Sequence, residues 1–365
     1  MKVLVMGGTQ FNGLALVHEL VRAGHDVTIC NRGRTEADLP PGVQRLLADR
    51  TDHEQLRAAL RGTEWDCVHD ISAYHPPDVE SMRDILAGSI GHYVFASSTV
   101  IYAANDDLPI TEDDPVERGP DQNEYGLHKI LCEDILLDAF EQQEFPATIA
   151  AFSMVFGPHN ALRDREQRMF ARMLVERPVL MPGDGTARLQ VGHVDDQARA
   201  LEQLMGNRAT FGKRYNLTGH EAVTRNAYVT TIAEVLGYEP EVVSIPAPTM
   251  EALWTGELEL GSGKANVGLD TRTSAATTKN PRAALLRRRF QVAQLVQHLA
   301  PNIHWWDRSV VFGIDRLRDD TGWEPQHDFG SMVEDTYDWF CRAGLDRSRT
   351  YDWDLEDAIL AELGA

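Results

Sequence analysis

The first 150 residues alternate short apolar runs with longer stretches in which apolar residues recur every three or four positions. The run at 2–6 enters glycines, and Leu14, Val17 and Leu20 then follow at helical spacing. Further strands are predicted at 26–30, 43–47, 66–71, 92–96 and 148–152. Helices are predicted between most of them, including 52–60, 77–86 and 123–140. Strands separated by helices pair in parallel with right-handed crossovers, so the pattern predicts an α/β fold with a doubly wound parallel sheet.

The alternation becomes irregular after Gly157, where prolines and glycines interrupt it. We therefore predict a dinucleotide-binding Rossmann domain over 1–156, with return segments near 190–216. A smaller α/β substrate lobe is expected mainly over 157–365. Within it, residues 261–300 hold seven Lys or Arg and one acid, a net charge of 7 − 1 = +6. This basic insertion could place cations on substrate phosphates or form a solvated helix.

The chain as a whole is acidic. Its 35 Lys and Arg against 56 Asp and Glu give a net charge of −21, and this field repels nucleic-acid phosphates and anionic lipid headgroups. No apolar run reaches the roughly 18–20 residues that a membrane span needs. The four cysteines form no CxxC pair, which indicates reduced thiols and a cytoplasmic protein. The histidines show no metal spacing, so we expect no metal, no nucleic acid and no membrane partner.

A glycine-rich turn, Gly7-Gly8-Thr9-Gln10-Phe11-Asn12-Gly13, joins the first predicted strand to the first predicted helix. Glycines there let the backbone approach a pyrophosphate, and a helix N-terminus supplies free N–H groups. Gln10 replaces the middle glycine of the GxxGxxG spacing. Such a turn can also exist without a ligand, but between a strand and a helix it predicts a dinucleotide site. The residues predicted to form it are Gly7, Thr9, Gln10, Phe11 and Gly13.

The ends of the second and third strands predict the adenosine contacts. The second strand runs into Asn31-Arg32-Gly33-Arg34 and has no acid for the ribose 2′-OH of NAD, whereas a cation there suits the 2′-phosphate of NADP. The predicted cofactor is therefore NAD(P), with Asn31 and Arg32 favouring NADP. Asp49 and Arg50 end the third strand and are predicted to contact the cofactor. Asp49 could instead cap the helix that follows.

A Tyr-xxx-Lys pair lies on a predicted helix at Tyr125 and Lys129. Residues four apart share one helix face, so the ammonium can lower the pKa of the phenol. A phenol tuned in this way can act as general acid or base during hydride transfer at a hydroxyl or ketone carbon. Ser98, at the end of the fifth strand, would place a hydroxyl at the same substrate oxygen. The predicted catalytic set is therefore Ser98, Tyr125 and Lys129.

In combination, these motifs resemble the extended short-chain dehydrogenase/reductase superfamily and its NAD-dependent epimerase/dehydratase family. The resemblance includes the glycine turn, Ser98 four residues before Tyr102, and the Tyr125/Lys129 pair, and it continues to Gly322-Trp323-Glu324-Pro325. It implies that Ser98 hydrogen-bonds the reacting oxygen, Tyr125 transfers a proton, and Lys129 also binds the nicotinamide ribose. It further implies substrate contacts at Thr99, His159, Asn160 and Arg188.

The same resemblance narrows the reaction. The 4,6-dehydratases carry an Asp-Glu pair after the catalytic hydroxyl, where this chain has Thr99-Val100. A 4-epimerase or keto-reductase is therefore expected, acting on a nucleotide-linked sugar or related polyol. The expected partner is a phosphorylated or nucleotide-linked small molecule, and the expected assembly is a homodimer.

The GGTxFxG turn followed by Asn-Arg-Gly also resembles an atypical subgroup that contains chloroplast stem-loop-binding proteins. The alternative is therefore a nucleic-acid-binding or regulatory protein that keeps the fold. The charge of −21 opposes this alternative, because binding to nucleic acid requires clustered cations.

Overall fold

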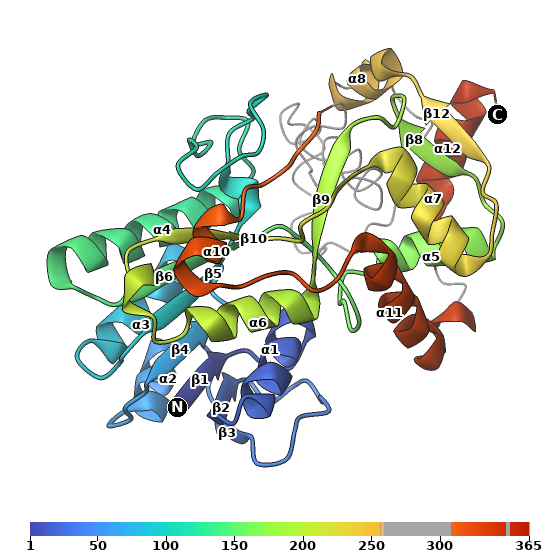
Figure 1. Ribbon diagram of the computed structural model, residues 1–365. Coiled ribbons are helices and arrows are strands. Elements are labelled where there is room, and N and C mark those ends of the chain that lie inside the picture. Colours follow the sequence, from blue (N-terminus) through green and yellow to red (C-terminus); the bar gives the residue numbers. More distant parts are fainter. Residues whose placement is uncertain (256, 259–307, 348–350, 365) are drawn as a thin grey trace, which may run out of the picture. The chain divides into compact units, whose positions relative to one another are not determined.

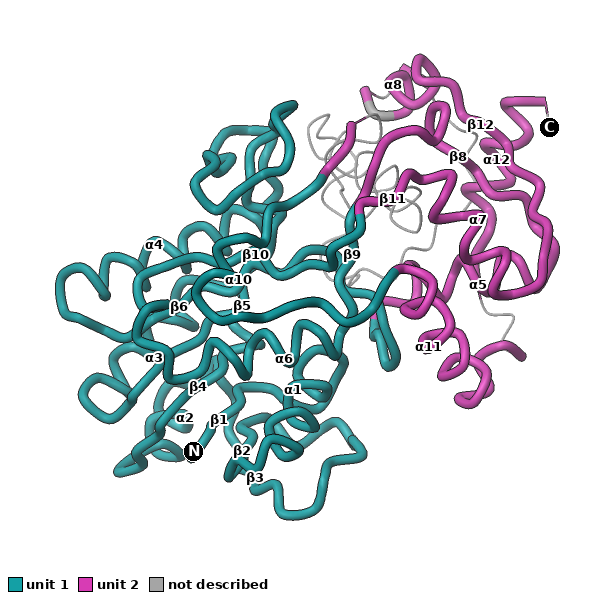
Figure 2. The backbone as a smooth tube through the Cα atoms, in the orientation of Figure 1, with its two compact units in different colours: residues 1–161, 190–221, 311–328 teal, residues 162–189, 222–310, 329–365 magenta. Residues whose placement is uncertain are grey.

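The computed structural model describes residues 1–255, 257–258, 308–347 and 351–364, which form two compact units (Figure 2). Unit 1 comprises residues 1–161, 190–221 and 311–328. Unit 2 comprises residues 162–189, 222–310 and 329–365. Residues 311–328, which the sequence assigned to the substrate lobe, thus fold with unit 1. The basic insertion 261–300 lies outside the described residues.

Unit 1 is built on a seven-stranded sheet in which neighbouring strands run parallel (Figure 1). Its strands are β1 (Lys2–Met6), β2 (Asp26–Asn31), β3 (Gln44–Leu47), β4 (Cys67–Asp70), β5 (Tyr93–Ser98), β6 (Ala147–Phe152) and β10 (Arg214–Leu217). They lie in the order β10-β6-β5-β4-β1-β2-β3. The order reverses at β1, as in a doubly wound sheet, so the predicted α/β fold is confirmed.

Side chains of the sheet alternate between two hydrophobic layers, because successive strand residues point to opposite faces. Val3 and Val5 of β1 pack with Leu16 in one layer, which also holds apolar residues of α6. Leu4 of β1 packs in the other layer, with apolar residues of three further helices. The first layer contains α1 (Phe11–Arg22) and α6 (Val194–Leu204), and the second contains α2 (His53–Leu60), α3 (Pro76–Leu86) and α4 (Glu124–Gln143).

Helix α4 begins where the chain returns to the end of β5. The side chain of Asn123 accepts a hydrogen bond from the N–H of Gly126 at 2.8 Å and so satisfies one free donor of the first turn. Gln122 donates through Nε2 to the carbonyl of Val100 at 3.0 Å, in the short 3₁₀ helix η1 (Thr99–Ile101) that follows β5. The first turns of α4 are thereby held at the carboxyl end of β5.

Residues 311–328, the last segment of unit 1, are anchored on one buried residue, Asp196 of α6. Its backbone carbonyl accepts from the indole of the fully buried Trp323 at 3.0 Å. Its Oδ2 accepts from the backbone N–H groups of Gln326 and His327 at 3.1 and 3.0 Å. Burial opposes ionisation of Asp196, but hydrogen bonds, with that from His327 the largest, keep its pKa below the usual range. Also in unit 1 are β7 (Met154–Phe156), which pairs in parallel with β9 (Arg188–His193), and α10 (Asp315–Thr321).

Unit 2 contains a parallel pair of short strands, β8 (Val179–Pro182) and β12 (Val242–Ile245). Leu180, Ile245 and Met250 form part of its hydrophobic core together with Ile359. Its other elements are α5 (Glu166–Leu174), β11 (Ala222–Thr224), α7 (Arg225–Leu236), α8 (Ala247–Thr255), α11 (Phe329–Arg342) and α12 (Asp354–Leu363). None of the helices in the described part of the chain is long and apolar enough to cross a membrane.

Candidate active site

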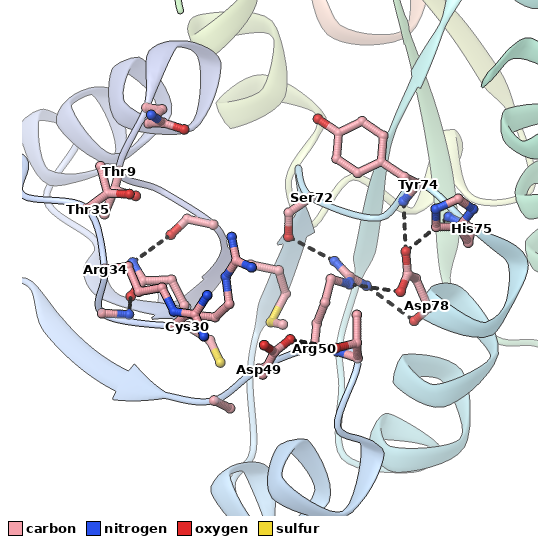
Figure 3. Close-up of a pocket in the computed structure, with 18 residues that line it drawn as sticks. Thr9, Cys30, Arg34, Thr35, Asp49, Arg50, Ser72, Tyr74, His75 and Asp78 are labelled. Atoms are coloured by element: carbon pink, nitrogen blue, oxygen red, sulfur yellow. Dashed lines mark hydrogen bonds and ion pairs between the residues drawn. The ribbon is translucent and has the colours of Figure 1, made fainter. Parts of the chain in front are cut away.

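A pocket of about 480 Å³ lies in unit 1, where the loops that follow β1, β2, β3 and β4 meet. Parallel strands bring their carboxyl ends to one edge of the sheet, and this edge is where such folds bind ligands. Figure 3 shows Thr9 and Arg34 on one side of the pocket and Tyr74 and His75 on the other. Segments distant in sequence therefore form a single cavity.

The glycine turn forms the part of the pocket nearest α1. Gly7 and Gly8 have φ values of 110° and 86°, which favour glycine. A Cβ on Gly13 would lie 2.8 Å from the N atom of Gly8, so only glycine lets the helix approach the turn this closely. Thr9 and Gln10 line the pocket together with Gly7, whereas Phe11 packs against the hydrophobic core.

The N-terminus of α1 is suited to an anion. The side chain of its N-cap residue, Gln10, makes no capping hydrogen bond, and the first turn carries no acidic residue. The free N–H groups of this turn and its positive dipole end therefore favour a phosphate. With the glycine cradle, these residues fit the pyrophosphate of a dinucleotide.

The far end of the pocket carries two exposed cations, Arg32 and Arg34, and one carboxylate, Asp49. Hydrogen bonds from Thr51 lower the pKa of Asp49, and the charges of Arg32 and Arg34 lower it further. Asn31 braces the loop: its Oδ1 accepts from the N–H of Gly33 at 2.9 Å. The excess positive charge at this end suits a phosphate group.

One interpretation of the sequence was that Asp49 caps the helix that follows, α2. The structure shows that it does not. The side chain of Asp52 is the N-cap acceptor and takes a hydrogen bond from the N–H of Gln55 at 3.0 Å. Asp49 instead accepts from the N–H and hydroxyl of Thr51 at 3.1 and 2.8 Å. Its carboxylate thus shapes the pocket wall just before α2.

Arg50 also lines the pocket, and Figure 3 shows its guanidinium joined to Ser72 and Asp78. It donates to both carboxylate oxygens of Asp70 at 2.7 and 2.9 Å and to the hydroxyl of Ser72 at 2.8 Å. The hydroxyl of Tyr93 donates to the same buried carboxylate at 2.6 Å. Burial opposes ionisation of Asp70, but Arg50 keeps its pKa below the usual range. Cofactor contact by Arg50 stays a prediction, and the geometry gives it a supporting role.

The predicted catalytic lysine is buried at the sheet edge. Lys129 is 3% exposed, and its Nζ donates to the carbonyls of Ala73 and Ala96, both at 2.7 Å. The ammonium lies 4.9 Å from the ring centroid of Tyr74 and 5.6 Å from that of Tyr125. Burial lowers the pKa of Lys129 to about 8. No carboxylate in the described residues lies within ion-pair distance of this ammonium.

Tyr125 stands at the surface above this lysine, with 41% of the residue exposed. Its ring centroid is 6.1 Å from that of Tyr74, which lines the dinucleotide pocket. His75, in the same wall, hydrogen-bonds His128 of α4 with an Nδ1–Nδ1 distance of 3.0 Å. The first turns of α4 therefore adjoin the pocket directly.

Ser98 and Thr99 lie at the end of β5 and the start of η1. Ser98 is half-buried, and its hydroxyl accepts from the N–H of Val100 at 3.4 Å. The carbonyl of Ala96, two residues earlier, is one of the acceptors for Lys129. The predicted hydroxyl and the predicted lysine therefore belong to the same edge of the sheet.

The predicted substrate contacts are divided between the units. Thr99, His159 and Asn160 belong to unit 1, where His159 has a φ of 64° and Asn160 is buried. Arg188 belongs to unit 2 and starts β9, and its N–H donates to the hydroxyl of Ser309 at 3.0 Å. Their contacts with substrate stay predictions.

Sequence reasoning missed several residues around the site. Tyr74 and His75 follow the fourth strand, and the rule that strand ends build the ligand site would have selected them. Glu133 follows Lys129 by four residues, so the helical spacing that paired Tyr125 with Lys129 would also have placed it on the same face. No sequence signal indicated its partner Arg214, which lies 81 positions further along the chain.

The sequence also matches known proteins. The NAD dependent epimerase/dehydratase family matches residues 3–218. A chloroplast stem-loop binding protein of 41 kDa from Arabidopsis thaliana is 30% identical over 256 residues, 66% of this chain and 65% of that protein. A 2'-dehydrokanamycin reductase from Streptomyces kanamyceticus is 25% identical over 250 residues, 68% of this chain and 70% of that protein. A UDP-glucose 4-epimerase from Azospirillum brasilense is 24% identical over 362 residues, 93% of this chain and 91% of that protein.

Solved structures agree on the fold. An epimerase from Methanothermobacter thermautotrophicus aligns with a TM-score of 0.69 at 20% identity, covering 94% of each chain. The matched family residues include the whole glycine turn, Ser98, Tyr125 and Lys129. The chain therefore belongs to the NAD dependent epimerase/dehydratase family, as its motifs predicted.

Proposed function

We propose that this protein is an NAD(P)-dependent 4-epimerase or keto-reductase that acts on a nucleotide-linked sugar or related polyol. One observation carries the proposal: the buried Lys129 ammonium lies beneath Tyr125, beside a pocket whose glycine turn suits a dinucleotide. Relatives named as a UDP-glucose 4-epimerase and a 2'-dehydrokanamycin reductase support this range of reactions. A cytoplasmic homodimer is part of the proposal.

The residues have distinct roles in this proposal. Tyr125 gives or takes a proton at its phenolic oxygen, and the nearby Lys129 charge favours the phenolate. Ser98 donates a hydrogen bond to the reacting substrate oxygen. Bound NAD(P) supplies a hydride acceptor or donor for the substrate carbon. Thr99 stands where a dehydratase carries a carboxylate, so we propose epimerisation or simple redox chemistry rather than dehydration.

We further propose a preference for NADP over NAD. The support is the pair of exposed cations at the far end of the pocket, Arg32 and Arg34, which can face a 2′-phosphate. Asp49 lies close enough to both for their charges to lower its pKa, so the three groups share one region. Arg32→Ala is expected to weaken NADP binding about tenfold or more and to leave NAD binding nearly unchanged.

The proposal is tested by identifying nucleotides that co-purify with the protein by mass spectrometry and then assaying turnover. UDP-galactose and UDP-glucose serve as probes for epimerisation, and a UDP-4-keto sugar with NADPH serves for reduction. Tyr125→Phe is expected to lower turnover by about 10²–10⁴-fold. Tyr238→Phe, a tyrosine of unit 2, is the matched control and should leave turnover unchanged. Equal turnover in both variants would overturn the assignment of Tyr125.

The relative from Arabidopsis thaliana supports a second candidate, binding of stem-loop nucleic acid. Its match with this chain covers 65% of that protein, and the net charge of −21 opposes the interaction. An electrophoretic mobility shift assay with a stem-loop RNA at physiological salt distinguishes the two. A shift at micromolar protein would favour this candidate, and no shift would remove it.

A further inference from the structure

Helix α4 carries a third functional group in register with Tyr125 and Lys129. Glu133 follows Lys129 by four residues and is fully buried. Its Oε1 accepts a hydrogen bond from the hydroxyl of Ser97 in β5. Its Oε2 accepts from Nε and Nη2 of Arg214 in β10, at 2.7 and 2.5 Å. We call Glu133, Ser97 and Arg214 the Glu133 bracket.

The Glu133 bracket joins the same two elements as the catalytic lysine does. Lys129 donates to the carbonyl of Ala96, and Glu133 accepts from the side chain of Ser97, the next residue of β5. On α4, the two residues are one helical turn apart. Two adjacent links between one strand end and one helix face oppose sliding or rotation of the helix at that point.

Arg214 extends the bracket to a third element. Its Nη1 donates to the carbonyl of Glu112 at 3.2 Å, and its guanidinium lies 5.7 Å from the ring centroid of Tyr102. The hydroxyl of Tyr102 donates in turn to Oδ1 of Asn216 in β10 at 2.7 Å. The guanidinium is thus fixed on several sides, so it can serve as a rigid support for Glu133.

Stability alone accounts poorly for this arrangement. Buried ion pairs contribute little net stability, because desolvation of the two charges offsets their attraction. Burial raises the pKa of Glu133, and Arg214 opposes that shift. Glu133 lies one helical turn from Lys129, and its partner Ser97 follows Ala96, whose carbonyl accepts from that lysine. This position indicates that the ion pair fixes the geometry around Lys129.

We propose that Glu133 is a positioning residue for the active site. With Ser97 and Arg214, it fixes the turn of α4 that carries Lys129 against the end of β5 and so keeps the ammonium beneath Tyr125. This inference rests on the proposed roles of Tyr125 and Lys129. It requires no knowledge of the substrate, so it can be tested without one.

The test follows ionisation of Tyr125 in the full-length protein labelled with ¹³Cζ-tyrosine, by NMR as a function of pH. The chain has nine tyrosines, and the resonance missing in Tyr125→Phe identifies the one of interest. Ser97→Ala removes one link of the bracket without changing charge, and Ser97→Thr keeps the hydroxyl. We expect Ser97→Ala to raise the titration midpoint by about half a pH unit or more and Ser97→Thr to restore it.

Glu133→Gln separates positioning from a direct charge effect. Loss of a nearby negative charge by itself lowers the midpoint of a tyrosine, whereas displacement of the ammonium raises it. We expect a rise. Thr148→Val is the control for the loss of a buried hydroxyl, because Thr148 donates to the carbonyl of Thr210 at 2.8 Å near the amino end of β6. It should leave the midpoint unchanged.

Lys129→Met provides the reference and separates the two proposals. If it raises the midpoint while Ser97→Ala and Glu133→Gln leave it unchanged or lower it, the positioning role is overturned and the catalytic assignment stands. If Lys129→Met itself has no effect, the coupling of Lys129 to Tyr125 fails and the positioning role fails with it. If Glu133→Gln does not fold, the Ser97→Ala and Ser97→Thr pair decides.

Discussion

Among the described residues, Lys129 of unit 1 and Arg172 of unit 2 are both cations buried almost completely, and the two are held in different ways. Arg172 of unit 2 forms an ion pair with Glu356 and donates to the carbonyl of Pro178 at 2.7 Å. Arg168 shares the same carboxylate at 3.0 Å. Lys129 of unit 1 is held by two neutral carbonyls and by aromatic rings, and no carboxylate in the described residues pairs with it.

The difference separates a cation held in an ion pair from one whose charge is left to act on its neighbours. A cation paired with a carboxylate has part of its field cancelled, so less of its charge acts on other groups. Neutral carbonyls solvate an ammonium but leave it a net positive charge, which can act on the nearby Tyr125 and on a ligand. Burial without a counter-ion costs stability, and this cost is consistent with a role in chemistry.

The largest expected effect is on catalysis. Lys129→Met removes the charge near Tyr125 and should lower turnover by about 10²–10⁴-fold. Its free energy of unfolding should stay within about 1 kcal/mol of the wild-type value, because relief of ammonium burial offsets the loss of two hydrogen bonds. Turnover is measured with the UDP-sugar probes and stability by urea denaturation. A stability loss above about 3 kcal/mol would instead make Lys129 structural.

Arg172→Met should do the opposite. It leaves Glu356 buried with Arg168 as its one remaining partner among the described residues, so the free energy of unfolding should fall by about 3 kcal/mol. Turnover per folded molecule should remain unchanged below the transition temperature. The double variant Arg172→Met/Glu356→Gln should recover part of the lost stability, because it removes the unpaired carboxylate. Loss of turnover without loss of stability would contradict the comparison.

The pH dependence of turnover tests whether the charge on Lys129 is required. Burial lowers the pKa of Lys129 from 10.5 to about 8, so turnover should fall about tenfold per pH unit above that value. In the same range the contribution of Lys129 to stability rises, since the unfolded chain retains a proton that the folded chain has released. Activity should therefore decline before structure does, as followed by turnover and circular dichroism from pH 7 to 10. Constant turnover across this range would exclude the charged lysine from the mechanism.

The smallest expected effect compares two helix caps. Asn123 accepts from the N–H of Gly126 at the start of α4, and Thr224 accepts from the N–H of Ala227 at the start of α7. Replacement of either by Ala should lower the free energy of unfolding by about 1 kcal/mol. Only Asn123→Ala should also lower turnover, by a few-fold, since α4 carries Tyr125. Equal turnover in both variants would show that the first turn of α4 tolerates fraying.

Much of unit 1 could be predicted from local patterns. The glycine turn, strand ends and Tyr125/Lys129 spacing depend on residues close in sequence, and the structure gives β1, β2 and α4 nearly the predicted bounds. Residues 311–328 could not be assigned to unit 1, because their anchor Asp196 is more than 120 positions away. Arg50 was similarly beyond local reasoning: its engagement with Asp70 depends on the pairing of four strands, β3, β2, β1 and β4.

The sequence by itself determined the family, the α/β class and the residue types available for dinucleotide and proton-transfer chemistry. These follow from periodicity and short motifs, which act within one turn or one strand. The tertiary structure decided that Lys129 is buried with no carboxylate of the described residues at ion-pair distance. It also decided that Arg50 is held by Asp70 and Ser72, and that Glu133 meets Ser97 and Arg214. Burial and ion pairing depend on which distant segments share a low-dielectric region, and only the folded chain brings these segments together.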